Sequence, residues 1–233
     1  MFRPEDYLDL NHTQHRLIFE KTVNVWEALR GIGTYLQFRL QPAIKAELIG
    51  KPVIEDNVFI GKGTIVEHGA MIKGPAWIGE DCEIRNGCYI RGNVVVGNDV
   101  VLGNSCEFKN CLIFDGARIP HFNYVGDSIL GYKAHLGAGV ILSNVRLDHQ
   151  EIQVAAPTGK VSTGLKKFGA IIGDYAEIGC NAVLSPGSVI GCHSVIYPGC
   201  QWRGILPPHS IAKVQQAIHI VLRKDSAKKT FPR

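Results

Sequence analysis

The residues most able to do chemistry lie in the segment 118–144, RIPHFNYVGDSILGYKAHLGAGVILSN. It supplies His121, Tyr124, His135 and Asn144, with a Gly-Ala-Gly run between the last two. A neutral imidazole accepts a proton near neutral pH, so a histidine here is a candidate general base. Two plainer roles compete with this one. His121 would be a corner histidine satisfied by the backbone, and His135 a packing or surface residue.

Two basic side chains upstream, Arg91 and Lys109, are spaced eighteen residues apart. In a coil of eighteen residues per turn, this spacing places them one above the other on the same face. Stacked cations repel each other unless an anion lies between them, and a phosphate would fit there. The alternative is that both are solvated surface residues.

The coil that would position these groups follows from a period of six. From Ile54 to Phe108, and again from Ile172 to Trp202, every sixth residue is aliphatic or aromatic, and the residue four positions later is nearly always small or β-branched. No α-helix or flat strand has this period, whereas a coil with three short flat faces does. The period is typical of hexapeptide-repeat proteins. Resemblance to them implies a left-handed parallel β-helix, here of about seven turns stacked about 4.8 Å apart.

Three departures from this period divide the chain. The count slips by one residue after Phe108 and again after Val125, and residues 145–170 interrupt it with a charged, Gly- and Thr-rich insertion. Residues 24–40 have helical spacing that ends at Pro42, and we expect this helix to cover the first coil. We therefore expect an N-terminal segment with a capping helix (1–50), a β-helix (51–207), and a C-terminal helix with a basic tail (208–233). In the last, Ile211, Val214, Ile218 and Leu222 would form one apolar stripe.

Composition restricts the class of protein. The 233 residues are 45% apolar, so a single domain with a sizeable core is expected, and neither a secretory leader nor a membrane span is recognisable. We expect a soluble cytoplasmic protein. The seven cysteines lack a CxxC pair, which predicts reduced packing thiols and no metal site. A net charge of +4 does not indicate nucleic-acid binding, and it is compatible with a phosphorylated ligand.

The segment KNCLIFDGARIPHFNYVGDSILGYKAHLGAGVILSN resembles a known family. It is similar to the acetyltransferase half of the bifunctional N-acetylglucosamine-1-phosphate uridyltransferase/glucosamine-1-phosphate acetyltransferases, and to archaeal sugar-1-phosphate nucleotidylyltransferase/acetyltransferases. The resemblance rests on the pattern H-[FL]-x-Y-[VL]-G-D, the Gly-Ala-Gly that follows it, and an Asn five residues beyond. It covers about residues 50–205, and the long insertion is more like the archaeal branch.

This resemblance implies acetyl transfer from acetyl-CoA, used as a co-substrate without a metal, to the amine of a hexosamine 1-phosphate. It also implies a homotrimer with acetyl-CoA bound between subunits. His121 matches the family's general base, and a backbone N–H would stabilise the oxyanion. The matched binding positions are Arg91, Lys109 and Lys167 for the phosphate, Tyr124 and Asn144 for the sugar or phosphate, and Ala138, Cys180 and Pro198 for CoA.

The chain departs from the family in two ways. His135 stands where the family usually has Asn, which bears on sugar recognition or on the tuning of His121. No nucleotidylyltransferase domain is recognisable, so uridyl transfer would be the work of a separate protein.

Two other functions stay open. One is a non-catalytic trimeric scaffold or partner of a nucleotidylyltransferase. The other is a zinc enzyme like the γ-carbonic anhydrases, which the chain resembles less because the close His pair of that branch is missing.

Overall fold

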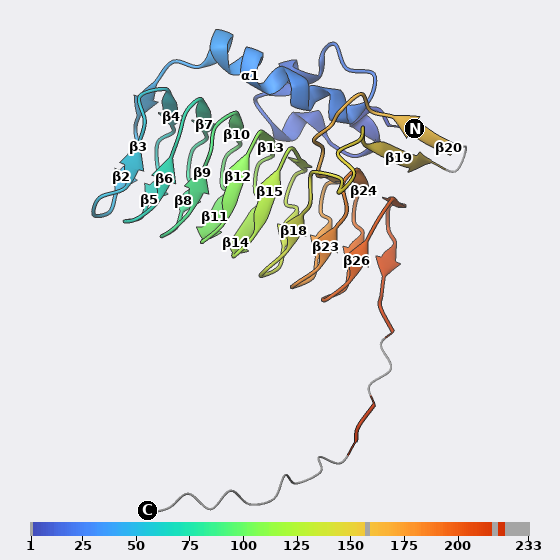
Figure 1. The fold of residues 1–233 in the computed structure, drawn as a ribbon. Coiled ribbons are helices and arrows are strands. Elements are labelled where there is room, and N and C mark those ends of the chain that lie inside the picture. The colour runs from blue at the N-terminus through green and yellow to red at the C-terminus, as the bar shows by residue number, and fades with distance from the viewer. Residues whose placement is uncertain (1, 157–158, 216–218, 222–233) are drawn as a thin grey trace, which may run out of the picture.

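The computed structural model describes residues 2–156, 159–215 and 219–221, and it is a parallel β-helix with an N-terminal segment along one side (Figure 1). Within these residues the coils form three parallel sheets. Sheet A contains β1 Ala43–Ile44, β4 Val58–Ile60, β7 Ala76–Ile78, β10 Val94–Val96, β13 Cys111–Ile113, β16 Ile129–Leu130, β21 Ala170–Ile172, β24 Ser188–Ile190 and β27 Ile205–Leu206. Sheet B contains β2 Glu47–Leu48, β5 Ile65–Val66, β8 Glu83–Ile84, β11 Val101–Asn104, β14 Arg118–His121, β17 His135–Leu136, β22 Glu177–Ile178, β25 Val195–Ile196 and β28 Ile211–Ala212. Sheet C contains β3 Val53–Ile54, β6 Met71–Ile72, β9 Tyr89–Ile90, β12 Glu107–Lys109, β15 Tyr124–Gly126, β18 Ile141–Leu142, β23 Val183–Leu184 and β26 Gln201–Trp202.

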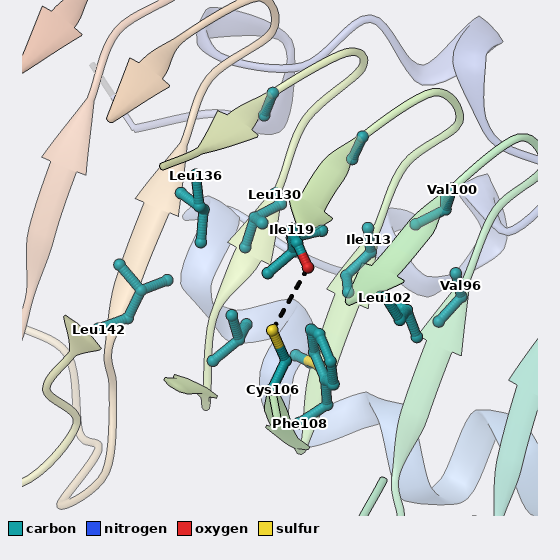
Figure 2. Packing of buried hydrophobic residues seen from close by; sticks show 14 of the residues in the cluster. Val96, Val100, Leu102, Cys106, Phe108, Ile113, Ile119, Leu130, Leu136 and Leu142 are labelled. Atoms are coloured by element: carbon teal, nitrogen blue, oxygen red, sulfur yellow. Dashed lines mark hydrogen bonds between the residues drawn. The ribbon is translucent and has the colours of Figure 1, made fainter. Parts of the chain in front are cut away.

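The fold class expected from the sequence, a left-handed parallel β-helix, is confirmed. The described coils number about nine rather than seven, because strands already form at Ala43 and the slipped hexads between residues 113 and 142 continue the coil. One large side chain per strand points into the prism, and Figure 2 shows Val96, Leu102 and Phe108 doing so in successive sheets.

The two slips in the period are real and shorten the coils. Strands β7 and β10 pair residue 76 with 94, a step of eighteen, whereas β10 and β13 pair 94 with 111, and β13 and β16 pair 112 with 129. Each slipped coil therefore has seventeen residues. The missing residue moves the corners between sheets, as a bulge does in an ordinary sheet.

The N-terminal segment does not cover the first coil, so the expected lid is wrong. It consists of η1 Pro4–Asp6, η2 Leu10–His12, η3 Arg16–Phe19, η4 Val25–Glu27 and α1 Ala28–Arg39. These elements lie along the outer face of sheet A (Figure 1). They bury its middle residues, which share a second apolar cluster with the segment: Trp77, Val95, Leu112, Ile129, Ile171, Val189 and Ile205. Apolar side chains on both faces of sheet A explain this placement, because a solvent-facing column of that kind would be costly.

The insertion at residues 145–170 is ordered where it is described. It forms an antiparallel hairpin of β19 Gln153–Ala156 and β20 Gly159–Ser162 beside the N-terminal segment. Trp26 and Phe168 pack with ring centroids 6.0 Å apart, and Arg30 donates to the Thr163 carbonyl at 3.2 Å. The hairpin thus extends the cover over sheet A.

The C-terminal helix expected from residue 208 is wrong at its start. Ile211 and Ala212 form β28, paired with Val195 and Ile196 in sheet B. Although the apolar residues here are spaced for a helix, the chain forms a strand, because the edge of sheet B provides hydrogen-bond partners for its backbone. Ile218 and Leu222 lie outside the described residues. Among the described helices, none has the length and apolar character needed to cross a membrane.

Candidate active site at two corners of sheet C

The two stacked cations lie at the corner where sheet C passes into sheet A. Ile90 pairs with Phe108, so Arg91 and Lys109, the next residue of each coil, stack as expected. Each has its own carboxylate. Arg91 Nη1 lies 2.7 Å from Glu107 Oε1, and Lys109 Nζ lies 3.2 Å from both oxygens of Asp127. These cations therefore do not require an outside anion, because the protein itself supplies a carboxylate for each of them.

Asp127 is the centre of this corner. Its side chain is 5% exposed, and besides Lys109 it accepts from Asn110 Nδ2 at 2.9 Å and from Asn144 Nδ2 at 2.6 Å. The Asn144 side chain also bonds the Tyr124 hydroxyl. Burial raises the pKa of Tyr124, while that hydrogen bond opposes the rise. Lys109, Tyr124 and Asn144, predicted from separate parts of the sequence, thus form one network around a carboxylate.

Lys167 reaches the same corner from the insertion. The N–H of Phe168 donates to the Asn144 carbonyl at 3.0 Å, and the N–H of Gly169 donates to the Asp127 carbonyl at 2.8 Å. These bonds anchor the backbone on both sides of the corner, and the Lys167 side chain is exposed there. Within the described residues Lys167 has no ion pair, so it is the unneutralised cation of this group.

His121 lies at the other corner of the same coil, where sheet B passes into sheet C. It ends β14 and is exposed to solvent. The Gly139 N–H donates to the His121 carbonyl at 3.0 Å, which places Ala138 directly below His121 in the next coil. Cys180 lies below Ala138 and Pro198 below Cys180, as the bonds from Asn181 to Ala138 and from Gly199 to Cys180 show. The predicted base and the three predicted CoA positions therefore form one column along an edge of the prism.

His135 joins neither corner. It begins β17 on sheet B, where its register neighbours are Arg118 and Glu177, and its side chain is exposed on the outer face. Tyr124 begins β15 directly after the His121 corner, and its hydroxyl reaches across Gly126 toward the cation corner. The strand of sheet C between the corners, β15, is three residues long, about 10 Å. Sheet C thus links the histidine at one corner to the cations of this and the two preceding coils at the other.

Reasoning from the sequence missed three polar residues at these corners: Glu107, Asp127 and Asn123. Asp127 belongs to the Gly-Asp pair of the motif, but no role followed from it. Asn123 occupies the small inward position that Cys106 fills in the coil before and Val140 in the coil after. An amide in a column of otherwise apolar residues is the signal that was available.

The cysteines lie free of disulfides in the described chain, and five of the seven are buried. Cys111 is wholly buried in an apolar setting, which raises its pKa far above that of an exposed thiol. Among the described residues, no cluster of three His, Cys, Asp or Glu side chains is arranged to hold a metal ion. The five buried thiols pack as small apolar groups.

Comparison with known proteins finds acetyltransferases among the relatives of this chain. A family model described as the GMPPB C-terminal domain matches residues 72–158. The chain is 46% identical over 168 residues to the bifunctional protein GlmU of Methanococcus maripaludis (strain C7), an alignment that covers 70% of this chain and 39% of that protein. It is 41% identical over 133 residues to the putative acetyltransferase YaiX of Escherichia coli K12, covering 57% of this chain and 58% of YaiX. The chain thus spans about two fifths of the length of the GlmU protein and three fifths of that of YaiX.

Among solved structures, the UDP-N-acetylglucosamine acyltransferase of Campylobacter jejuni aligns with a TM-score of 0.44 at 15% identity, covering 69% of each chain. The resemblance to sugar-1-phosphate nucleotidylyltransferase/acetyltransferases that the motif indicated is confirmed by the relatives found.

Proposed function

We propose that this chain, a hexapeptide-repeat protein related to the acetyltransferases, moves an acetyl group from acetyl-CoA to the amine of a hexosamine 1-phosphate. The observation that carries the proposal is the arrangement of the two corners. His121 lies above Ala138 at one corner, and Lys109 and Lys167 lie at the other, across the three-residue strand β15, which is about 10 Å long. A hexosamine ring with its anomeric phosphate would bridge this span, with the long lysine side chains on the phosphate.

In the proposed reaction the amine nitrogen attacks the thioester carbonyl carbon. His121 takes the proton of the attacking nitrogen, the C–N bond forms, and the carbonyl oxygen becomes an oxyanion near the Ala138 N–H. The C–S bond then breaks, and the proton passes to the departing thiolate to give CoA. Reaction through a neutral imidazole needs neither a metal nor an enzyme-bound intermediate.

Each other residue has a role in binding. Lys167 is unpaired within the described residues and would contact the phosphate first, while Arg91 and Lys109 would share it with Glu107 and Asp127. Tyr124 and Asn144 would orient the sugar through their hydroxyl and amide groups, whereas His135, exposed on the outer face of sheet B, has no role in this proposal. Ala138, Cys180 and Pro198 would line the path of the extended CoA arm. We infer a homotrimer, in which a neighbouring subunit would close this open face around acetyl-CoA.

The test is acetyl-CoA consumption by the purified protein with glucosamine 1-phosphate, galactosamine 1-phosphate or free glucosamine. We expect turnover with a sugar 1-phosphate and a much higher KM for the free sugar. His121→Ala should lower kcat by about 10³-fold, the scale of general base catalysis, with CoA affinity retained. The matched control is His68→Ala, because His68 is an exposed histidine three coils away in the same corner column and should leave kcat unchanged.

Three outcomes would overturn the proposal. Full activity of His121→Ala would remove the mechanism. Absence of CoA binding by calorimetry would remove the reaction and favour a scaffold that partners a nucleotidylyltransferase. Stoichiometric zinc in the purified protein, held by histidines, would favour the carbonic-anhydrase type of chemistry instead.

A further inference from the structure

One buried amide lies directly behind the His121 corner. Asn123 is 2% exposed and points into the β-helix, at the position where Cys106 and Val140 pack in the adjacent coils. A primary amide has two donors and an acceptor, and burying it without partners costs more than the Cys, Ala or Val found at this position elsewhere. The hydrogen bonds of Asn123 must therefore compensate for the burial of its amide.

Those bonds join the two backbone segments that form the corner. Asn123 Oδ1 accepts from the His121 N–H at 3.1 Å, and Asn123 Nδ2 donates to the Gly137 carbonyl at 2.7 Å. The Cys106 thiol lies 3.5 Å from the same Oδ1. Because a backbone N–H can only donate and a carbonyl can only accept, the orientation of the amide is fixed.

The hydrogen bond from Asn123 to the Gly137 carbonyl also fixes the direction of the Ala138 N–H, which belongs to the same peptide group. In a planar trans peptide the carbonyl and the N–H point in opposite directions, and among the described residues the cis bond lies elsewhere, at Gly74-Pro75. With the Gly137 carbonyl held inward by Asn123, the Ala138 N–H points outward toward the exposed side of the corner. Within the described chain this N–H donates to no protein group.

We propose that Asn123 is a positioning residue that sets the base and the oxyanion donor relative to each other. One rigid amide holds the backbone of His121 and the peptide that presents the Ala138 N–H, so neither can shift without breaking a buried hydrogen bond. This inference rests on the proposed acetyl transfer, and it adds a residue that touches neither substrate.

The first test is Asn123→Ala, assayed for kcat and KM separately. We expect kcat to fall by about 10²-fold, the lower end of the loss of an oxyanion donor, with the KM for both substrates within about threefold. Thr64→Val is the control for stability, because Thr64 is also buried and joins two coils, bonding the Gly79 carbonyl at 2.8 Å and the Cys82 N–H at 3.0 Å far from the corner. It should keep kcat unchanged.

The second variant, Asn123→Asp, separates positioning from packing by its pH profile. A protonated carboxyl keeps one donor and one acceptor, whereas a carboxylate can only accept and would repel the Gly137 carbonyl. Its kcat relative to wild type should therefore rise as the pH is lowered. A purely structural role predicts a constant ratio.

Amide hydrogen exchange tests the positioning role of Asn123 without an activity assay. In Asn123→Ala the His121 amide should exchange at least tenfold faster than in the wild-type protein, while amides of the remote β5 and β8 strands keep their rates. Wild-type kcat in Asn123→Ala, or an unchanged exchange rate at His121, overturns the positioning role. An inactive wild-type protein overturns the proposed function instead, and the exchange rates then decide the role of Asn123 alone.

Discussion

The buried carboxylate of Asp127 gives the sharpest prediction about the cation corner. Asp127→Asn keeps the shape of the side chain but removes the charge that faces Lys109. The amide must also turn its NH₂ group toward one of three donors, Lys109, Asn110 or Asn144, so at least one strong bond is lost. Removing one partner of a buried ion pair costs about 3–5 kcal/mol. The Lys109 side chain is 27% exposed and regains some hydration, so we expect a loss of about 2–3 kcal/mol in the free energy of unfolding.

The measurement is urea unfolding followed by circular dichroism, for Asp127→Asn, Lys109→Met and the double variant. The two losses should not add: we expect a coupling energy of about 1–2 kcal/mol. Glu107→Gln is the matched control, since the Arg91–Glu107 pair is solvent-exposed and should contribute less than about 1 kcal/mol. Additivity within about 0.5 kcal/mol for Asp127 and Lys109, or an equal loss for Glu107→Gln, would refute the reasoning.

Two further predictions follow from the corner column and the N-terminal segment. Ala138→Pro removes the outward N–H at a position that Pro198 occupies two coils below, so the fold should persist while kcat falls by about 10²-fold or more in the acetyl-CoA assay; wild-type kcat would exclude this N–H as the oxyanion donor. Burial lowers the pKa of His15 to about 4. The unfolded state therefore binds a proton below about pH 6.5 that the folded state does not, and stability, complete above that pH, should fall by about 3 kcal/mol as the pH drops to 4. Urea midpoints across this window should lose much of that slope in His15→Phe, and an identical slope would contradict the assignment.

The sequence predicted the coil and its register because both follow from a period. A residue at every sixth position must fill a three-sided prism, and a spacing of eighteen must stack Arg91 on Lys109. The slips after Phe108 and Val125 could also be predicted, because a hexad that lacks one residue shifts every later apolar position by one.

The period of six does not predict which residues on the outer face of each sheet are buried. The apolar middle residues of sheet A, such as Val95 and Leu112, were visible as unbroken apolar triplets, yet their burial depends on the N-terminal segment, which ends more than fifty residues earlier in the chain. The carboxylates Glu107 and Asp127 were missed for a related reason. An acidic residue pairs with a cation of a neighbouring coil only if both side chains adopt suitable rotamers, and the spacing in the sequence does not predict those rotamers.

The N-terminal segment and the hairpin of the insertion change how this solenoid holds together. In a simple stack each coil contacts only its neighbours, so stability is a sum of local terms and unfolding can spread from either end. Here one apolar cluster joins the outer face of sheet A from Trp77 to Ile205. Coils far apart in the stack therefore lose their shared partner together, which makes the region that carries both corners a single cooperative unit. The coil of β1, β2 and β3 lies beyond that cluster and is the end from which fraying would begin.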